Sequence, residues 1–255
     1  TGVTDGVYDV FRGLRFGTPP IGPRRFEPSH PFTSAGDYDA TRFGAWCFQA
    51  TAPMRPDPKN TYSEDCLFLN IWRPSSATPA SKLPVMFWIH GGSFTQGSGA
   101  DELFKGSNLA LMRNVVVVTI NYRLGPLGFL TIDSSGAGGM NGIGDAILAL
   151  KWVQTNIRAF GGDPSQVTVF GESAGGCATC TLAISPASQN LIHHSIIQSG
   201  PCVGPWGPGS KDEGLMALTA LKASLNVTSV AELREVPASS LQWAVPAPTF
   251  FLDDG

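Results

Sequence analysis

The chain has 255 residues, of which 42% are hydrophobic and 15% are charged, and its formal net charge at pH 7 is −3. A chain of this length buries about three quarters of its unfolded surface, so a stable globular core is expected. The weak negative charge and the lack of any lysine or arginine run argue against a nucleic-acid or anionic-lipid partner. No apolar stretch approaches the ~20 residues that cross a bilayer, so no transmembrane segment is predicted.

The start of the chain and its cysteines indicate a compartment. The sequence begins at Thr1 rather than methionine, which suits a mature product whose signal peptide has been removed, although an artificially trimmed chain would begin in the same way. Asn226 opens an Asn-Val-Thr sequon and is the predicted N-glycosylation site. Five cysteines are an odd number, so at least one is expected to be free or to bond outside the chain. We therefore expect a secreted protein, or one from another oxidising compartment.

The first half of the chain predicts one connection and then three strands. Residues 17–31 are rich in proline, which removes backbone donors and blocks helix, so they predict an extended surface segment. Residues 67–74, 83–92 and 115–123 are rich in β-branched and aromatic side chains. Such runs predict strands that are buried on both faces of a sheet.

The second half alternates helices and strands. Apolar residues recur at steps of three and four over 143–160, which predicts a helix of about five turns. Further elements are predicted as a strand at 166–170, a helix from Ala174 and a strand at 193–200. This alternation favours a largely parallel α/β sheet. Beyond Ser199 we expect a loop, a helix at 211–225 and short helical pieces broken by prolines up to residue 248, all within one domain or a large part of one.

Ser173 stands between two glycines in the sequence GESAG, after a predicted strand and before a predicted helix. The bare pattern occurs by chance, but this context is typical of an elbow that exposes a serine hydroxyl at the carboxyl end of a strand. Gly171 and Gly175 are the positions where a side chain would crowd that turn. The helix would direct the Ala174 N–H toward an anion at the serine. A second set of donors is expected from residues 88–94, although an ordinary strand-ending loop is the alternative.

Six sequence motifs carry a resemblance to a known family. They are FRGLRFGTPPIGPRRF (11–26), SEDCLFLNIW (63–72), PVMFWIHGGSF (84–94), NYRLGPLGFL (121–130), the stretch 141–176 that ends in GESAGG, and IIQSG (196–200). In this order they resemble the type-B carboxylesterase and lipase family, the cholinesterase-like branch of the α/β-hydrolases. The resemblance implies the α/β-hydrolase fold, with a mostly parallel central sheet and flanking helices. Residues 1–255 would form the N-terminal part of that single domain.

The resemblance also assigns roles to site residues. It implies that Ser173 is the nucleophile and that the N–H groups of Gly92, Ser93 and Ala174 form the oxyanion hole. Gly91 would serve the turn. The family usually has glycine where this chain has Ser93, so the added hydroxymethyl group is expected to narrow the range of substrates.

The cysteines match the family in part. Cys47 and Cys66 match its first disulfide, which would stabilise the fold by on the order of 3 kcal/mol. Cholinesterases carry a choline-binding tryptophan inside this loop, and this chain has none there, so a choline ester is not the expected substrate. Cys177 and Cys180 are interpreted as two packed small residues on a helix rather than a redox or metal pair. Cys202 could pair with either of them or with another chain.

Charged residues match two structural ion pairs of the family. These are Arg25 with Glu64 and Arg123 with Asp145. Glu172 directly precedes the predicted nucleophile, but adjacent side chains on a tight turn point apart. We therefore expect Glu172 to have a supporting role rather than a catalytic one.

The base that would activate Ser173 is the missing part of this assignment. A serine nucleophile needs a histidine that is oriented by an acid. His30 and His90 match non-catalytic positions of the family, while His193 and His194 follow the serine too soon for the order serine, acid, histidine. We expect the acid (Glu or Asp) and the histidine on a second chain, the C-terminal half, separated at an exposed loop after residues 249–255.

The leading hypothesis is a serine hydrolase that cleaves small-molecule or lipid carboxylic esters through an acyl-enzyme on Ser173. This chemistry needs no cofactor and no metal. A lipase or acyltransferase variant would use the same acyl-enzyme. The alternative of another class is a non-catalytic binding or adhesion protein on the same fold. A truncated, inactive product is the third hypothesis.

Overall fold

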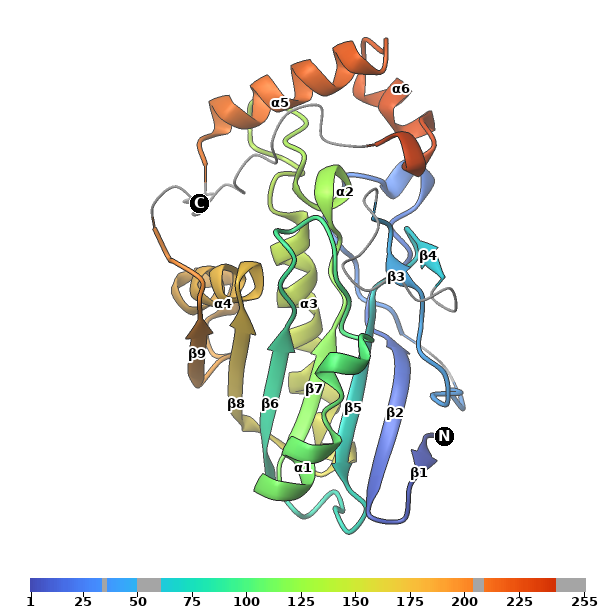
Figure 1. The fold of residues 1–255 in the computed structure, drawn as a ribbon, viewed down its shortest axis with the longest axis vertical. Helices are drawn as coiled ribbons and strands as arrows, with labels where there is room; N and C mark the ends of the chain where they lie inside the picture. The colour runs from blue at the N-terminus through green and yellow to red at the C-terminus, as the bar shows by residue number, and fades with distance from the viewer. Residues whose placement is uncertain (34–35, 50–60, 204–208, 242–255) are drawn as a thin grey trace.

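A computed structural model of the protein describes residues 1–33, 36–49, 61–203 and 209–241. Figure 1 shows a twisted sheet with α3 behind it and α1 in front, while α5 and α6 lie beyond one end of the strands. The strands of the sheet, in spatial order, are β1 (Val3–Thr4), β2 (Tyr8–Arg15), β5 (Phe68–Pro74), β7 (Val116–Ile120), β6 (Leu83–Ile89), β8 (Gly162–Glu172) and β9 (His194–Gln198). A separate two-stranded ladder joins β3 (Trp46–Cys47) to β4 (Tyr62–Ser63).

The helices connect and cover the strands. They are α1 (Ser107–Arg113), α2 (Gly125–Phe129), α3 (Asn141–Asn156), α4 (Ala174–Ile184), α5 (Lys211–Ser224) and α6 (Val230–Glu235). Short 3-10 turns lie at Gly22–Arg24, Glu102–Phe104, Ile157–Phe160, Pro186–Ser188 and Ala238–Ser240. In the described part of the chain, none of the helices combines the length and the hydrophobicity needed to span a bilayer.

The sheet has an antiparallel side and a parallel side. From β1 through β2 and β5 to β7 the neighbours are antiparallel, whereas β7, β6, β8 and β9 pair in parallel. Ile89 at the end of β6 is paired with Gly171 near the end of β8. The carboxyl ends of these two strands therefore lie side by side, which is where parallel α/β sheets bind their ligands.

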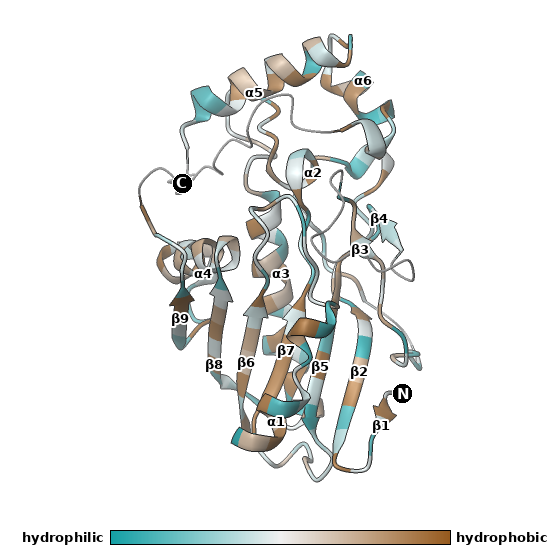
Figure 2. Cartoon of the chain, in the orientation of Figure 1, coloured by the Kyte–Doolittle hydropathy of each residue, from teal (hydrophilic) through white to brown (hydrophobic). Residues whose placement is uncertain are grey.

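The core lies on both faces of the central strands. Every residue of β7 is buried, as expected for a run of β-branched side chains in a doubly covered strand. Figure 2 shows hydrophobic residues concentrated along the central strands. α3 packs its buried stripe, which includes Ile143, Leu150 and Val153, against this layer. The sequence predicts a helix that continues to residue 160, but α3 ends at Asn156 and Ile157–Phe160 form a separate 3-10 turn.

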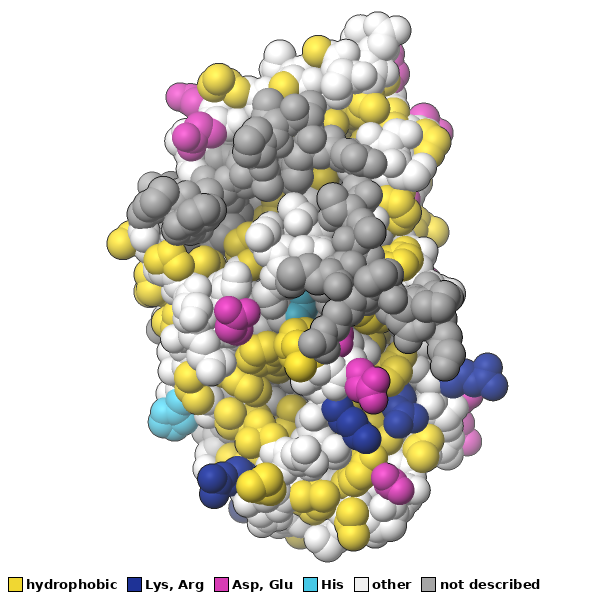
Figure 3. All heavy atoms as spheres, in the orientation of Figure 1, with side chains coloured by type: hydrophobic (Ala, Val, Ile, Leu, Met, Phe, Trp, Pro, Cys, Tyr) yellow, Lys and Arg dark blue, Asp and Glu magenta, His cyan; other side chains and the backbone are white. Residues whose placement is uncertain are grey.

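The surface of the face drawn in Figure 3 is mostly uncharged. Lys and Arg side chains among the described residues are few on this face, and most of them lie toward its lower right, next to Asp or Glu side chains. The described part of this face therefore shows no concentrated basic patch.

The prediction for residues 17–31 is wrong in part. Phe26 is buried and packs with Leu218, Leu221 and Leu233 from α5 and α6 in a second hydrophobic cluster. Arg25 is also buried. The prolines keep the segment out of regular helix and sheet, but its apolar side chains still anchor the helices beyond the strand ends. The stretches at 50–60, 242–248 and 249–255 lie outside the described residues.

Two disulfides occur among the described residues. One joins Cys47 to Cys66, with a Cα–Cα distance of 4.8 Å, and the other joins Cys180 to Cys202, with a distance of 5.5 Å. Of the partners that the sequence left open for Cys202, the structure shows Cys180, because the loop after β9 brings Cys202 against α4. Cys177 keeps its thiol and is buried. Two disulfides fit an oxidising compartment.

Both ion pairs implied by the resemblance are present. Arg25 Nε lies 2.7 Å from Glu64 Oε2, and Arg25 Nη1 also donates to the carbonyl of Arg234 at 2.8 Å. Arg123 donates from Nε and Nη2 to the two oxygens of Asp145, at 2.9 and 2.7 Å. The second pair is buried and joins the segment after β7 to the first turns of α3.

Candidate active site

Ser173 occupies the sharp turn between β8 and α4. Its backbone has φ 56° and ψ −121°, a conformation that non-glycine residues rarely adopt. The Ser173 N–H donates to the Gln198 carbonyl at 2.9 Å, and the Ser173 carbonyl accepts from the Cys177 N–H at 3.0 Å. Such backbone strain costs about 1–3 kcal/mol and is concentrated at active sites. The surrounding strand and helix therefore hold Ser173 in a strained position at the carboxyl end of β8.

The glycines around Ser173 allow three backbones to meet. A Cβ on Gly171 would lie 2.3 Å from the Gly175 carbonyl oxygen, and a Cβ on Gly175 would lie 2.1 Å from the Ile89 carbonyl oxygen. Both distances are far shorter than a van der Waals contact. The end of β6, the elbow and the first turn of α4 therefore pack backbone against backbone.

Substitution of Gly175 by alanine is expected to destabilise the protein by about 1–3 kcal/mol or more, because the new methyl group overlaps the Ile89 carbonyl. Gly144→Ala is the matched control: a Cβ at Gly144, inside α3, meets nothing within 4 Å and should stabilise the helix by up to about 1 kcal/mol. Thermal unfolding of the two variants measures the difference. Equal melting temperatures would contradict the packing described.

The turn after β6 lies directly against the elbow. A Cβ on Gly91 would lie 2.7 Å from the Glu172 carbonyl oxygen and 3.2 Å from Ser173 Cβ. Gly92 has φ 109° and Ser93 has φ 54°, and the Gly92 carbonyl accepts the N–H groups of two later residues of the turn. Within the described residues, the N–H groups of Gly92, Ser93 and Ala174 have no hydrogen-bond acceptor. Gly91 therefore brings this turn into contact with the elbow at Ser173.

His90 is buried beneath this turn. Its Nδ1 lies 2.8 Å from the Gly91 carbonyl oxygen, and its ring stacks on Tyr122 with 4.4 Å between the ring centres. Because a carbonyl only accepts, Nδ1 carries the proton of the neutral imidazole. Burial lowers the pKa of His90 from 6.5 to about 4, and the hydrogen bond to Gly91 opposes this shift. Burial also raises the pKa of Tyr122, whose hydroxyl donates to the His90 carbonyl at 2.9 Å.

The shifted pKa of His90 predicts acid sensitivity. Between pH 6.5 and 4 the unfolded chain binds a proton at this imidazole that the folded protein excludes, so the free energy of unfolding falls as the pH falls. Because of this single group, the free energy of unfolding is expected to fall by about 2 kcal/mol as the pH is lowered from 7 to 5. Urea unfolding of the complete protein at the two pH values, compared with His90→Gln, measures the effect. An equal loss in the wild type and the variant would contradict it.

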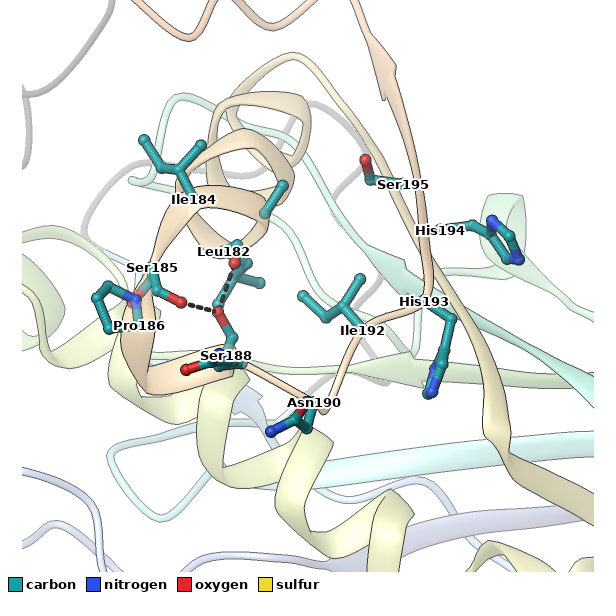
Figure 4. Close-up of a pocket in the computed structure, with 12 residues that line it drawn as sticks. Leu182, Ile184, Ser185, Pro186, Ser188, Asn190, Ile192, His193, His194 and Ser195 are labelled. Atoms are coloured by element: carbon teal, nitrogen blue, oxygen red, sulfur yellow. Dashed lines mark hydrogen bonds between the residues drawn. The ribbon is translucent and has the colours of Figure 1, made fainter.

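The other histidines lie away from Ser173. His194 is paired with Thr168, five residues before Ser173 along β8, which corresponds to about 16 Å along the strand. Figure 4 shows His193 and His194 at the start of β9, beside a hollow lined by the end of α4 and the turn that follows it. His30 is exposed in the proline-rich segment. Among the described residues, no histidine forms a hydrogen bond with Ser173 Oγ.

The remaining predicted residues have simple environments. Glu172 is exposed, and its backbone supports the turn at Gly91. Asn226 is exposed just after α5, with φ 53°. Over the described ranges, His, Cys, Asp and Glu nowhere form a group of three that could hold a metal ion. Sequence reasoning did not identify Tyr122 as a support of the turn, although it lies in one of the motifs quoted above.

Comparisons with known proteins identify the family of the chain. Residues 1–247 match the model of the Carboxylesterase family. Cocaine esterase of Oryctolagus cuniculus is 46% identical over 77% of this chain and 38% of its own length, and cocaine esterase of Homo sapiens is 41% identical over 94% and 43%. The solved structure of a PNB esterase has a TM-score of 0.85 at 40% identity, over 95% of this chain and 50% of that one. This chain spans less than half the length of these two cocaine esterases. It belongs to the carboxylesterase family and has the α/β-hydrolase fold.

Proposed function

We propose that the complete protein hydrolyses carboxylic esters through an acyl-enzyme on Ser173. The observation that carries this proposal is the strained backbone of Ser173 at the carboxyl end of β8, with the Gly91 turn in contact with it. Relatives of the chain are named as esterases of small molecules, which supports a small-molecule or lipid ester as substrate.

The chemistry follows from the arrangement of donors. Ser173 Oγ attacks the ester carbonyl carbon as a histidine base takes its proton. The carbonyl oxygen becomes an anion, which the N–H groups of Gly92, Ser93 and Ala174 stabilise together with the positive end of α4. The histidine returns its proton to the leaving alcohol, and water then releases the acid from Ser173. The exposed Ser93 hydroxymethyl group narrows the space beside these donors.

The acid and the histidine of the triad come, in this proposal, from the C-terminal half of the same α/β-hydrolase domain, present as a second chain. Support comes from β9, which pairs with β8 on one side and exposes Ile196 and Ile197 at 46% and 40%. An edge that pairs with no other described strand, next to exposed apolar side chains, is suited to pair with a further strand. Mass spectrometry of the intact native protein is expected to show a companion polypeptide. Detection of residues 1–255 alone, or of one longer chain, would remove the two-chain form.

Ester hydrolysis is tested by rapid kinetics with p-nitrophenyl esters of increasing acyl length. When hydrolysis of the acyl-enzyme is the slower step, the mechanism predicts an initial burst that approaches one p-nitrophenolate per Ser173, followed by slower turnover. Acyl length separates an esterase from a lipase, and added alcohol reveals acyl transfer. A folded complete protein with neither burst nor turnover would contradict the proposal and favour the non-catalytic binding protein.

The two disulfides fit any oxidising compartment. We infer that the protein is secreted and carries an N-linked glycan at Asn226, which is exposed in the structure. A mass shift after glycosidase treatment that disappears in Asn226→Gln is the expected result. Unmodified Asn226 in protein from its native source would contradict the glycan.

A further inference from the structure

Gln49 follows Cys47 of the first disulfide and contacts the turn after β6, residues 90–97, which is called the oxyanion turn below. Its side-chain amide bonds both polar groups of the Gly97 backbone: Nε2 donates to the Gly97 carbonyl at 2.7 Å, and Oε1 accepts the Gly97 N–H at 3.0 Å. Gln49 lies two residues after Cys47, which the disulfide to Cys66 fixes in place. Two opposed hydrogen bonds from one planar amide fix both the position and the orientation of the Gly97 backbone.

Gly97 in turn packs against the support of the oxyanion turn. A Cβ on Gly97 would lie 2.4 Å from His90 Nδ1 and 2.7 Å from the Gly91 carbonyl oxygen, and Gly97 has φ 113°. Its backbone therefore lies against the two groups that form the His90–Gly91 hydrogen bond. A shift of Gly97 would open or close the space in which that bond forms.

The His90–Gly91 hydrogen bond sets the direction of a proposed catalytic donor. The Gly91 carbonyl and the Gly92 N–H belong to one peptide unit, which is trans because the described residues contain no cis peptide bond. In a trans unit these two groups point in opposite directions. Holding the carbonyl against His90 Nδ1 at 2.8 Å therefore aims the Gly92 N–H away from His90.

From these contacts we infer that Gln49 is a positioning residue for the oxyanion hole, acting through Gly97 and His90 on the Gly92 N–H. Gln49 touches neither the substrate nor Ser173 in this account. The inference rests on the proposed function, since it concerns the donors of that same site. It places part of the control of turnover at Gln49, two residues after Cys47, outside the elbow and the turn themselves.

The test compares Gln49→Ala with Gln154→Ala in the complete protein. Gln154 is a matched control, because it is also partly buried and its Nε2 donates to the backbone carbonyls of Pro164 and Leu191, at 3.0 and 3.2 Å. Loss of one whole oxyanion donor lowers kcat by about 10²–10³, so a misaimed donor is expected to lower it at least about tenfold. KM should change less than about twofold, because the ground-state carbonyl depends less on the donor. Gln154→Ala should leave both parameters near the wild-type values.

Two further measurements separate positioning from folding. A trifluoromethyl ketone, whose adduct with Ser173 mimics the tetrahedral anion, should lose affinity for Gln49→Ala by the same factor as kcat/KM. Gln49→Glu keeps an acceptor for the Gly97 N–H but places a second carboxylate oxygen against the Gly97 carbonyl oxygen, where two acceptors repel, so its kcat should also fall below that of the wild type. Equal kcat values in Gln49→Ala and Gln154→Ala would overturn the inference while leaving the proposed function intact. A wild-type protein without turnover would overturn both.

Discussion

Replacement of Ser173 by alanine is expected to lower kcat of the complete enzyme about a millionfold, the scale at which a serine hydrolase loses its nucleophile. Alanine has no Oγ with which to form the acyl-enzyme. It takes up the φ of 56° no more easily than serine does, so the stability of the protein should change little. Initial rates with a p-nitrophenyl ester, together with a thermal melt, measure the two effects separately.

Ser165→Ala is the control for this substitution. Ser165 lies on β8, the strand that leads to Ser173, but near the opposite end of that strand. Its side chain is exposed, and its Oγ donates to Asp163 at 2.7 Å. Its loss should leave kcat unchanged. Activity in Ser173→Ala above about one thousandth of the wild-type rate would mean that another group attacks the ester.

Removal of the Asp145 carboxylate is expected to destabilise the protein by about 3–5 kcal/mol. Asp145 is fully buried and accepts hydrogen bonds from the Arg123 guanidinium and, at 2.9 Å, from the Arg123 backbone N–H. Without it the buried guanidinium keeps the Glu27 carbonyl as its acceptor, at 2.7 Å, and loses its charge partner. Urea unfolding of Asp145→Ala, followed by tryptophan fluorescence, measures the loss.

Two comparisons identify the uncompensated charge as the cause. Asp133→Ala removes an exposed carboxylate that bonds only within its own turn, and it should have a far smaller effect. The double variant Arg123→Met with Asp145→Leu removes both buried charges and should be less destabilised than Asp145→Ala alone. Additive losses in the double variant would contradict the account.

Most of the parallel half of the sheet could be predicted from local patterns. β7 is buried on both faces, so a nearly continuous β-branched run identifies it. α3 covers one face of the sheet, so its apolar residues recur at helical spacing. Ser173 could be identified from the sequence because a strained elbow needs small residues on both sides, and Gly171 and Gly175 lie beside it.

β2 escaped prediction because its charges are neutralised only by the fold. Asp9 lies 3.0 Å from Arg73, and Arg15 pairs with Asp65 at 2.9 Å, so partners far along the chain make these polar positions acceptable in a strand. Gly13, with φ 65°, interrupts the pairing with β5 and breaks the alternation of side chains. The two residues of each pair lie 64 and 50 positions apart in the sequence, so no local pattern contains both.

The support of the oxyanion turn escaped prediction for a similar reason. Gln49 and Gly97 are 48 residues apart in the sequence and meet only in the folded chain. The partner of Cys180 also depends on the path of the chain after β9, so spacing alone left Cys202 with several choices. The turn's glycines could be predicted from sequence, whereas the side chains that hold the turn could not.

The most direct test of the esterase assignment is labelling of the complete native protein with a fluorophosphonate, followed by intact mass and peptide mapping. The account predicts one covalent adduct per protein, located on Ser173, and its loss in Ser173→Ala. A folded protein that stays unlabelled, or an adduct on another residue, would contradict the assignment of Ser173 as an activated nucleophile and favour a non-catalytic role for this fold.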